Sequence, residues 1–235
     1  MKIRLLYLYP EVMNTYGDRG NVMFLEARAQ DYGIDLTTDY YTLGDHLDIS
    51  SYQLLFFGGG QDKGQDLIAN DLLSNQDQFG QAFRNNIAGL LICGGYQMFG
   101  KSIELANGEK LNGLEILPVR TLVGSKRKIG NLLVRSQEFG QLIGFENHSG
   151  NTILEDPKQA LGETIMGYGN NDSATSEGII YSNLIGTYMH GPFLPKNIQV
   201  ADWLLGRALD RDLQTNTSSA LYQASIKARE ASLLS

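Results

Sequence analysis

The sequence predicts an α/β fold: an open, mostly parallel, doubly wound sheet flanked by helices, with a smaller antiparallel portion in the second half. Two observations predict it. Short runs rich in β-branched and aromatic residues alternate three times with helix-forming segments. Several of these runs are apolar throughout and stop at glycine or cysteine, as strands buried on both faces of a parallel sheet do. Such a sheet binds its ligands at the carboxyl ends of its strands.

The first half supplies the repeated units. A strand is expected over residues 3–9, followed by a turn-rich loop at 14–21, and Asn21 is expected to cap a helix over residues 22–29. The further expected elements are strands at 34–41, 52–57 and 89–92, a helix at 65–85, and a helix that begins at Tyr96.

The second half is less regular. The expected elements are shorter, partly antiparallel strands at 132–134, 152–154, 178–181 and 184–188, and a final helix over 197–209. Because no linker or internal repeat interrupts residues 1–212, they are predicted to form one domain. Residues 213–235 form a polar tail that is expected to be mobile or to dock a partner.

Composition excludes several classes of protein. The 235 residues include 19 Lys and Arg against 26 Asp and Glu, and the net charge of −7 disfavours nucleic acid as the main ligand. A single cysteine excludes a disulfide framework and a cysteine-built zinc site within the chain. No apolar run approaches the roughly 20 residues of a membrane helix, and the N-terminus does not resemble a signal peptide. We therefore expect a cytoplasmic, globular protein.

Cys93 is the residue on which the functional prediction depends most. It ends a predicted buried strand and precedes Gly94 and Gly95, which lead into a helix. This is the pattern of a nucleophile elbow, in which small neighbours let the backbone turn sharply and leave the nucleophile accessible. A cysteine here can also be an inert core side chain, although a core cysteine does not need two glycines after it.

A cysteine nucleophile needs a base, and the chain has three histidines. His46 lies in a polar stretch and is expected to be a solvated loop residue. His148 lies in a polar turn that has room to line a pocket. His190 follows a predicted strand directly and precedes Gly191, so it is the best placed of the three to face Cys93.

Glycines 58–60 follow the strand at 52–57. They form either a simple turn or part of an oxyanion hole, whose backbone N–H groups stabilise a developing negative charge. Neither a P-loop sequence nor Gly-x-Gly-x-x-Gly spacing is present, so nucleotide binding is not expected.

These segments resemble class I glutamine amidotransferases of the cobyric acid synthase type. The resemblance rests on the three glycines at 58–60, Ile-Cys-Gly-Gly-Tyr-Gln at 92–97, Tyr-Met-His-Gly-Pro at 188–192 and the loop at 14–21. The segments 145–148, 167–172 and 194–197 are more similar to the GatD group. These are the glutaminase subunits of lipid II isoglutaminyl synthases, which work with the Mur-ligase-like subunit MurT.

The resemblance implies a reaction and a set of site residues. Cys93 is expected to attack the side-chain amide of L-glutamine, and His190 to move the proton to the leaving ammonia. Arg127 is expected to bind the α-carboxylate of glutamine through its planar guanidinium, although its basic neighbours also fit a solvated loop. Further substrate contacts are expected from the backbone of Gly60 and Gly94, as the oxyanion hole, and from Gln97.

The resemblance also implies a heterodimer without a cofactor or metal in this chain. ATP and Mg²⁺ are expected on MurT, which would use the ammonia to amidate the α-carboxylate of D-glutamate in the lipid II stem peptide. Many class I relatives carry His-x-Glu, whereas Pro192 occupies the third position here. The sequence therefore predicts only a Cys93–His190 dyad, and the resemblance implies that an aspartate of the partner completes a triad.

Three other functions stay open at this point. The chain could donate ammonia to another ATP-dependent amidase, such as one acting on cobyrinate, but those domains are usually fused to a long ATP-using half that this sequence does not contain. It could be a non-catalytic scaffold subunit, for which Cys93, His190 and Arg127 would serve no purpose. It could be a cysteine peptidase-like hydrolase, which Gly-Gly-Tyr-Gln after the cysteine disfavours.

Overall fold

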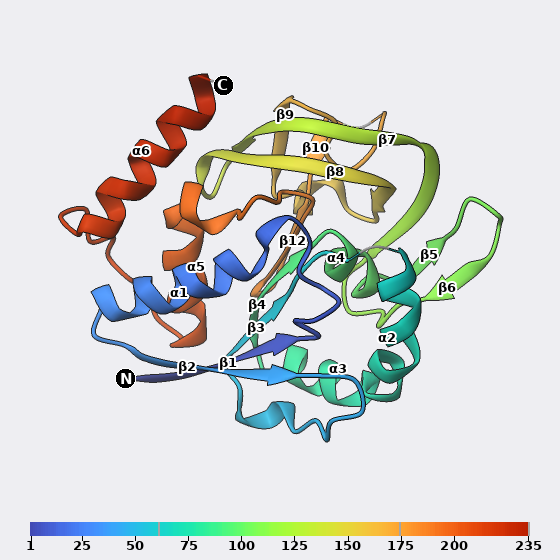
Figure 1. The fold of residues 1–235 in the computed structure, drawn as a ribbon, viewed down its shortest axis with the longest axis horizontal. Helices are drawn as coiled ribbons and strands as arrows, with labels where there is room; N and C mark the ends of the chain where they lie inside the picture. Colours follow the sequence, from blue (N-terminus) through green and yellow to red (C-terminus); the bar gives the residue numbers. More distant parts are fainter. Residues whose placement is uncertain (61, 174, 235) are drawn as a thin grey trace.

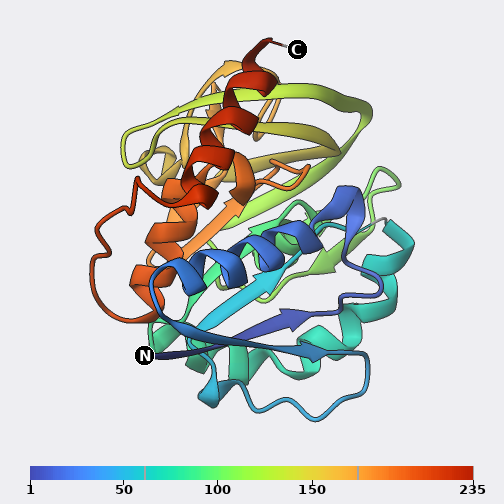
Figure 2. The same cartoon turned by 60° about the vertical axis from the view of Figure 1, so that its left-hand side comes forward.

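A computed structural model of the chain describes residues 1–60, 62–173 and 175–234. Within these residues the chain forms two β-sheets, and helices cover both faces of the first one (Figures 1 and 2). The first sheet holds the candidate site.

The first sheet has six strands in the order β11-β12-β4-β3-β1-β2. Neighbouring strands are parallel except β11, which pairs antiparallel with β12. This confirms the predicted open, mostly parallel sheet. The strands are β1 (Lys2–Leu8), β2 (Asp35–Tyr41), β3 (Leu54–Phe57), β4 (Ala88–Ile92), β11 (Ile179–Tyr181) and β12 (Leu184–Thr187).

The central strands are apolar because helices lie on both of their faces. Every residue of β3, β4 and β12 is buried. Helices α1 (Arg19–Asp31) and α5 (Ile198–Ala208) lie on one face of the sheet, and α2 (Asp62–Ser74) and α3 (Gln76–Arg84) lie on the other (Figure 2). The short helix α4 (Gly94–Met98) follows β4 directly.

The second sheet is built around a long antiparallel hairpin of β7 (Val119–Ser136) and β8 (Gly140–Leu154). Its order is β10-β9-β7-β5-β6, with β8 paired to β7. The sequence predicted short strands at 132–134 and 152–154, which are only parts of this hairpin. Much of β7 is exposed and carries Lys, Arg and Gly, so an apolar run marks only its buried end. The remaining strands are β5 (Ser102–Glu104), β6 (Lys110–Asn112), β9 (Gly162–Met166) and β10 (Ser176–Glu177).

Two expectations for helices differ from the structure. The segment predicted as one helix over 65–85 forms α2 and α3, with Asn75 between them. Helix α1 begins at Arg19, so Asn21 is not its cap. The Asn21 side chain is buried inside the helix and accepts a hydrogen bond from the Leu194 N–H at 2.8 Å.

The polar segment after residue 212 contains a helix that the sequence did not predict, α6 (Ala220–Leu234), which lies at the edge of the molecule in Figure 1 and contacts β8 and residues Leu194–Lys196. The chain leading into it is attached to α1 through Arg28, whose guanidinium donates to Ser219 Oγ at 3.0 Å. The same fully buried guanidinium pairs with the Asp202 carboxylate of α5 at 2.6 Å. Removing one partner of such a buried pair typically costs about 3–5 kcal/mol.

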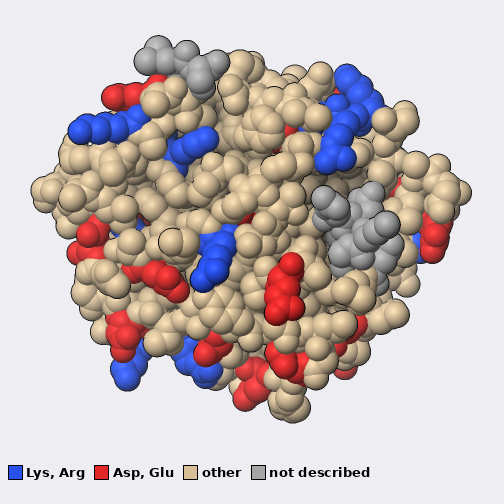
Figure 3. All heavy atoms as spheres, viewed as in Figure 1, with Lys and Arg blue, Asp and Glu red and all other residues tan. Residues whose placement is uncertain are grey.

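The described part of the chain contains no helix that is both long and apolar enough to span a bilayer. On the face drawn in Figure 3, acidic and basic side chains are interspersed, and no continuous basic surface covers it.

Candidate active site

The candidate site lies at the carboxyl edge of the first sheet, where four neighbouring parallel strands end. In the order β12-β4-β3-β1, these strands are followed by His190, Cys93, glycines 58–60 and the loop that carries Asp18. Adjacent parallel strands end at the same edge, so this order brings together residues that are far apart in the sequence.

Cys93 has the strained backbone of a nucleophile elbow. Its φ of 49° and ψ of −101° lie in a region that residues with a side chain rarely adopt. The turn is held by the Cys93 N–H, which donates to the Thr187 carbonyl at 2.8 Å. A methyl group on Gly95 would lie 2.7 Å from the Phe57 carbonyl oxygen, so close packing against the end of β3 requires glycine there. The predicted strand-to-helix turn is therefore present.

Gly59 lies between the side chains of Cys93, His190 and Asp18. A methyl group on Gly59 would lie 2.5 Å from Cε1 of His190, 3.2 Å from Oδ2 of Asp18 and 3.3 Å from Cβ of Cys93. The three side chains therefore surround one glycine, and the missing side chain is what allows them to approach each other.

The His190 imidazole is buried and contacts a carboxylate of this chain. Its Nδ1 lies 3.2 Å from Oδ1 of Asp18, while Nε2 is buried without a hydrogen-bond partner in the described residues. Burial lowers the pKa of His190, but the Asp18 hydrogen bond and the nearby Cys93 outweigh it and raise this pKa to about 10. This shift favours the imidazolium form of His190.

The sequence predicted a bare Cys93–His190 dyad in this chain, and the structure places a carboxylate of the same chain beside His190 as well. The carboxylate comes from Asp18, 172 residues before His190, and not from the position of Pro192. A motif made of the residues next to His190 cannot contain a partner from another strand loop. One feature of the sequence pointed to this region: Asp18 lies in the family-like loop at 14–21.

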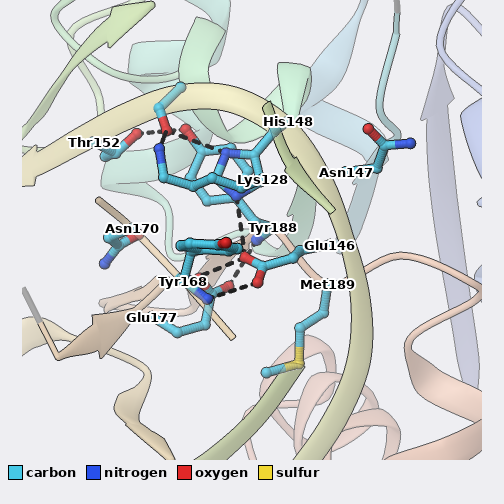
Figure 4. A network of polar contacts seen from close by, with 12 residues as sticks. Lys128, Glu146, Asn147, His148, Thr152, Tyr168, Asn170, Glu177, Tyr188 and Met189 are labelled. Atoms are coloured by element: carbon cyan, nitrogen blue, oxygen red, sulfur yellow. Dashed lines mark hydrogen bonds and ion pairs between the residues drawn. The ribbon is translucent and has the colours of Figure 1, made fainter. Parts of the chain in front are cut away.

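The other two histidines have different surroundings. His46 is exposed, as expected. His148 is buried in a polar network (Figure 4), where Nε2 lies 3.3 Å from the Glu146 carboxylate and Nδ1 faces the Gly150 carbonyl. Its ring stacks on Tyr188 with 3.6 Å between centroids, and burial lowers the pKa of His148. His148 is thus packed between Glu146 and Tyr188, close to the strand end that leads to His190.

The network extends to Gln97. Its side-chain amide donates to the Tyr188 hydroxyl at 3.1 Å, and that hydroxyl lies 2.6 Å from Oγ1 of Thr152. Gln97 is thus buried beside the elbow with its amide nitrogen already engaged. Its predicted contact with substrate stays a prediction.

Arg127 lies on the exposed part of β7 and is connected to His190 through Asn147 and Tyr16. Its Nε donates to Oδ1 of Asn147 at 2.5 Å, and the Asn147 amide donates to the Tyr16 hydroxyl at 2.6 Å. The Tyr16 ring meets the His190 ring edge-on at 5.1 Å. The guanidinium therefore belongs to the rim of the same site.

The two glycines predicted for the oxyanion hole follow neighbouring strands, β4 and β3. Gly94 is the first residue of α4, and Gly60 ends the glycine run after β3. A methyl group on Gly60 would lie 2.2 Å from Sδ of Met13, so the Met13 side chain, from the loop after β1, occupies the space beside Gly60. Their role toward an oxyanion stays a prediction. Among the described residues, no cluster of three or more His, Cys, Asp or Glu suits a metal ion.

Comparison with known protein families agrees with this geometry. Residues 4–198 match the model of the CobB/CobQ-like glutamine amidotransferase domain. This chain belongs to that family. It is therefore a glutamine amidotransferase, as the resemblance implied.

Within the family, the chain is similar over nearly its whole length to two curated proteins. Both are named lipid II isoglutaminyl synthase (glutamine-hydrolyzing) subunit GatD. The protein from Streptococcus pneumoniae is 37% identical over 94% of this chain and 86% of its own length. The protein from Staphylococcus aureus is 36% identical over 89% of this chain and 86% of its own length. A probable cobyric acid synthase from Methanothermobacter thermautotrophicus is 34% identical, but over only 43% of this chain and 23% of its own length.

Solved structures support the fold. PurLQS from Thermotoga maritima aligns with a TM-score of 0.57 at 17% identity, covering 97% of this chain and 99% of the other. The glutaminase domain of Trypanosoma brucei CTPS with bound acivicin aligns with a TM-score of 0.53 at 12% identity, covering 90% and 96%.

Proposed function

We propose that this chain is the glutaminase subunit of a lipid II isoglutaminyl synthase. It hydrolyses L-glutamine to glutamate and ammonia and passes the ammonia to a Mur-ligase-like partner, MurT. The partner amidates the α-carboxylate of D-glutamate in the lipid II stem peptide. The observation that carries this proposal is the strained Cys93 beside His190, in a chain that matches two GatD subunits over about nine-tenths of its length.

The chemistry proceeds through a thioester on Cys93. The sulfur attacks the side-chain carbonyl carbon of glutamine, and the C–N bond breaks as His190 gives a proton to the leaving ammonia. Water then attacks the γ-glutamyl thioester and gives its proton to His190, and the C–S bond breaks to release glutamate. The imidazolium form of His190 suits the first proton transfer, because a raised pKa keeps the proton available at neutral pH.

Backbone groups and one arginine hold the substrate. The N–H groups of Gly60 and Gly94 stabilise the oxyanion that forms on the side-chain carbonyl oxygen. The guanidinium of Arg127 binds the α-carboxylate with two parallel hydrogen bonds, exchanging its present contact with Asn147. Gln97, on α4, lines the substrate pocket, and its amide is held by a hydrogen bond to the Tyr188 hydroxyl.

The partner supplies the energy of amide formation. ATP and Mg²⁺ bind to the Mur-ligase-like subunit and activate the D-glutamate carboxylate, while this chain needs no cofactor. Both subunits work in the cytoplasm. The word "subunit" in the names of both GatD relatives supports a heteromeric assembly.

Transfer of the amide nitrogen tests the proposal. The chain is mixed with the Mur-ligase-like protein, ATP, Mg²⁺, lipid II and glutamine carrying an isotope label on its side-chain amide nitrogen. Mass spectrometry of the stem peptide is expected to find the label in the isoglutaminyl amide. Cys93→Ala is the control: it abolishes transfer from glutamine, but free ammonium salt restores amidation because the partner is intact. Glutamine hydrolysis without transfer to lipid II would point to a different acceptor, such as cobyrinate.

A further inference from the structure

We infer that Asn147 is a specificity residue of the proposed glutamine site. Its side-chain oxygen holds the Arg127 guanidinium before substrate binds, and the same oxygen accepts a hydrogen bond from the α-ammonium group of bound glutamine. The inference deepens the proposed glutaminase function and rests on it. It adds a second side chain that recognises the amino-acid end of the substrate, beside the arginine that takes the α-carboxylate.

The β7–β8 hairpin presents Arg127 and Asn147 on the same face. Asn147 of β8 pairs with Ile129 of β7, and Arg127 comes two residues before Ile129. Residues two apart in a strand point to the same side, so the two side chains are diagonal neighbours. The alternate residues Lys128 and His148 are buried. Figure 4 shows the Asn147 side chain directed away from the network that contains them.

The basic neighbours of Arg127 have other partners. Lys126 lies over the Tyr168 ring, with Nζ 4.5 Å from the ring centre. The buried Nζ of Lys128 donates to a backbone carbonyl of β8 at 3.1 Å. Arg127 instead donates to the side chain of Asn147. The basic stretch is therefore not a uniformly solvated loop, because one of its three cations is directed at the rim of the candidate site.

The Asn147 amide is held with its oxygen toward Arg127. Its Nδ2 donates to the Tyr16 hydroxyl at 2.6 Å, which leaves Oδ1 to accept from Nε of Arg127 at 2.5 Å. Tyr16 is itself constrained, because its φ of 56° is uncommon for a residue with a side chain and its ring meets the His190 ring at 5.1 Å. A single tyrosine therefore links the catalytic histidine to this amide and sets the amide's orientation.

The two groups are complementary to the charged end of an amino acid. Nε of Arg127 is a charged donor and Oδ1 of Asn147 is a neutral acceptor, whereas an α-carboxylate accepts and an α-ammonium donates. When the carboxylate takes the guanidinium, Oδ1 of Asn147 loses its partner, and an acceptor without a hydrogen bond is unfavourable. The ammonium is attached to the same carbon as the carboxylate, so it is the donor that can replace the lost contact.

Binding of two compounds to Cys93→Ala tests the inference without catalysis. Calorimetry compares L-glutamine with glutaramate, which has the same carboxylate and side-chain amide but no α-amino group. A hydrogen bond to the charged ammonium is expected to make glutamine bind about tenfold or more tightly than glutaramate. When Asn147→Leu is added to Cys93→Ala, this preference is expected to be lost, because leucine has a similar shape but accepts no hydrogen bond.

Two further variants are compared in the same Cys93→Ala background. Gln141→Leu removes an exposed amide near the other end of β8 and is expected to keep the full preference for glutamine. Tyr16→Phe removes the hydroxyl that orients the Asn147 amide and is expected to lower the preference about threefold. The midpoint of thermal unfolding is recorded for each variant to exclude misfolding.

An unchanged preference for glutamine in Asn147→Leu would overturn the inference. If both compounds bound equally more weakly to that variant, Asn147 would only position Arg127. A Cys93→Ala chain that does not bind glutamine would overturn the inference as well. Glutamate release by the wild-type chain tests the proposed function separately. No release, together with loss of the preference in Asn147→Leu, would contradict that function and leave the ammonium contact established.

Discussion

Replacing Gly59 with alanine tests whether Cys93, His190 and Asp18 form one working site. Gly59 does not have a positive φ, so its backbone accepts an alanine and the substitution tests space alone. The added methyl group would lie 2.5 Å from Cε1 of His190. Ordinary van der Waals contact between carbon atoms begins at about 3.5 Å, so the ring or the glycine loop must move by about 1 Å.

A displacement of this size has a large kinetic effect. A misplacement of about 1 Å can cost roughly 10²-fold in rate, and overpacking a tight interior typically costs about 1–3 kcal/mol of stability. We therefore expect Gly59→Ala to remain folded, with a lower free energy of unfolding and a kcat/KM for glutamine reduced about a hundredfold. The assay is glutamate release, with urea denaturation in parallel.

Gly80→Ala is the matched control. Gly80 lies in α3, away from the sheet edge, and the methyl group would meet only the flexible end of Arg84 at 3.4 Å. This variant is expected to retain kcat/KM. A folded Gly59→Ala with the kcat/KM of Gly80→Ala would refute the claim that these three side chains meet around Gly59.

Two further predictions follow from the same geometry. Arg127→Lys is expected to raise KM for glutamine about tenfold or more, because a bidentate charged contact worth roughly 1.5–3 kcal/mol becomes a single one. Alkylation of Cys93 by a small electrophile is expected to be unaffected. An unchanged KM would show that Arg127 lies outside the substrate site. Because the pKa of His190 rises from 6.5 to about 10 on folding, the folded protein binds a proton between these pH values that the unfolded chain has released. The free energy of unfolding should therefore fall as pH rises through this window, and His190→Gln should not show this fall. If the free energy of unfolding had the same pH dependence in the two proteins, the raised pKa of His190 would be contradicted.

The central sheet could be predicted because its signals are local. Each buried strand is a short apolar run, and at β3 and β4 the run stops at the residues that form the site. Cys93 followed by two glycines likewise contains its own turn in consecutive residues. The hairpin of β7 and β8 was underestimated because exposed strands alternate polar and apolar residues, and its basic stretch at 125–128 reads as a loop.

The contact between Asp18 and His190 could not be predicted from sequence because it depends on strand order. Nothing near residue 18 specifies that β1 lies beside β3, or that β12 lies beside β4. Those pairings set the distance between Asp18 and His190. Helix α6 was missed for a similar reason: its segment is polar, and it packs on the domain through contacts such as Arg28 with Ser219, which join distant parts of the chain.

A covalent intermediate on Cys93 tests the central claim most directly. The full chain is mixed with glutamine, quenched in acid within the first turnover, digested and analysed by mass spectrometry. The thioester mechanism predicts that the peptide containing Cys93 gains the mass of a γ-glutamyl group, and that Cys93→Ser neither carries this thioester nor releases glutamate at the wild-type rate. Glutamate release at the wild-type rate from Cys93→Ser, or an adduct on another residue, would contradict it.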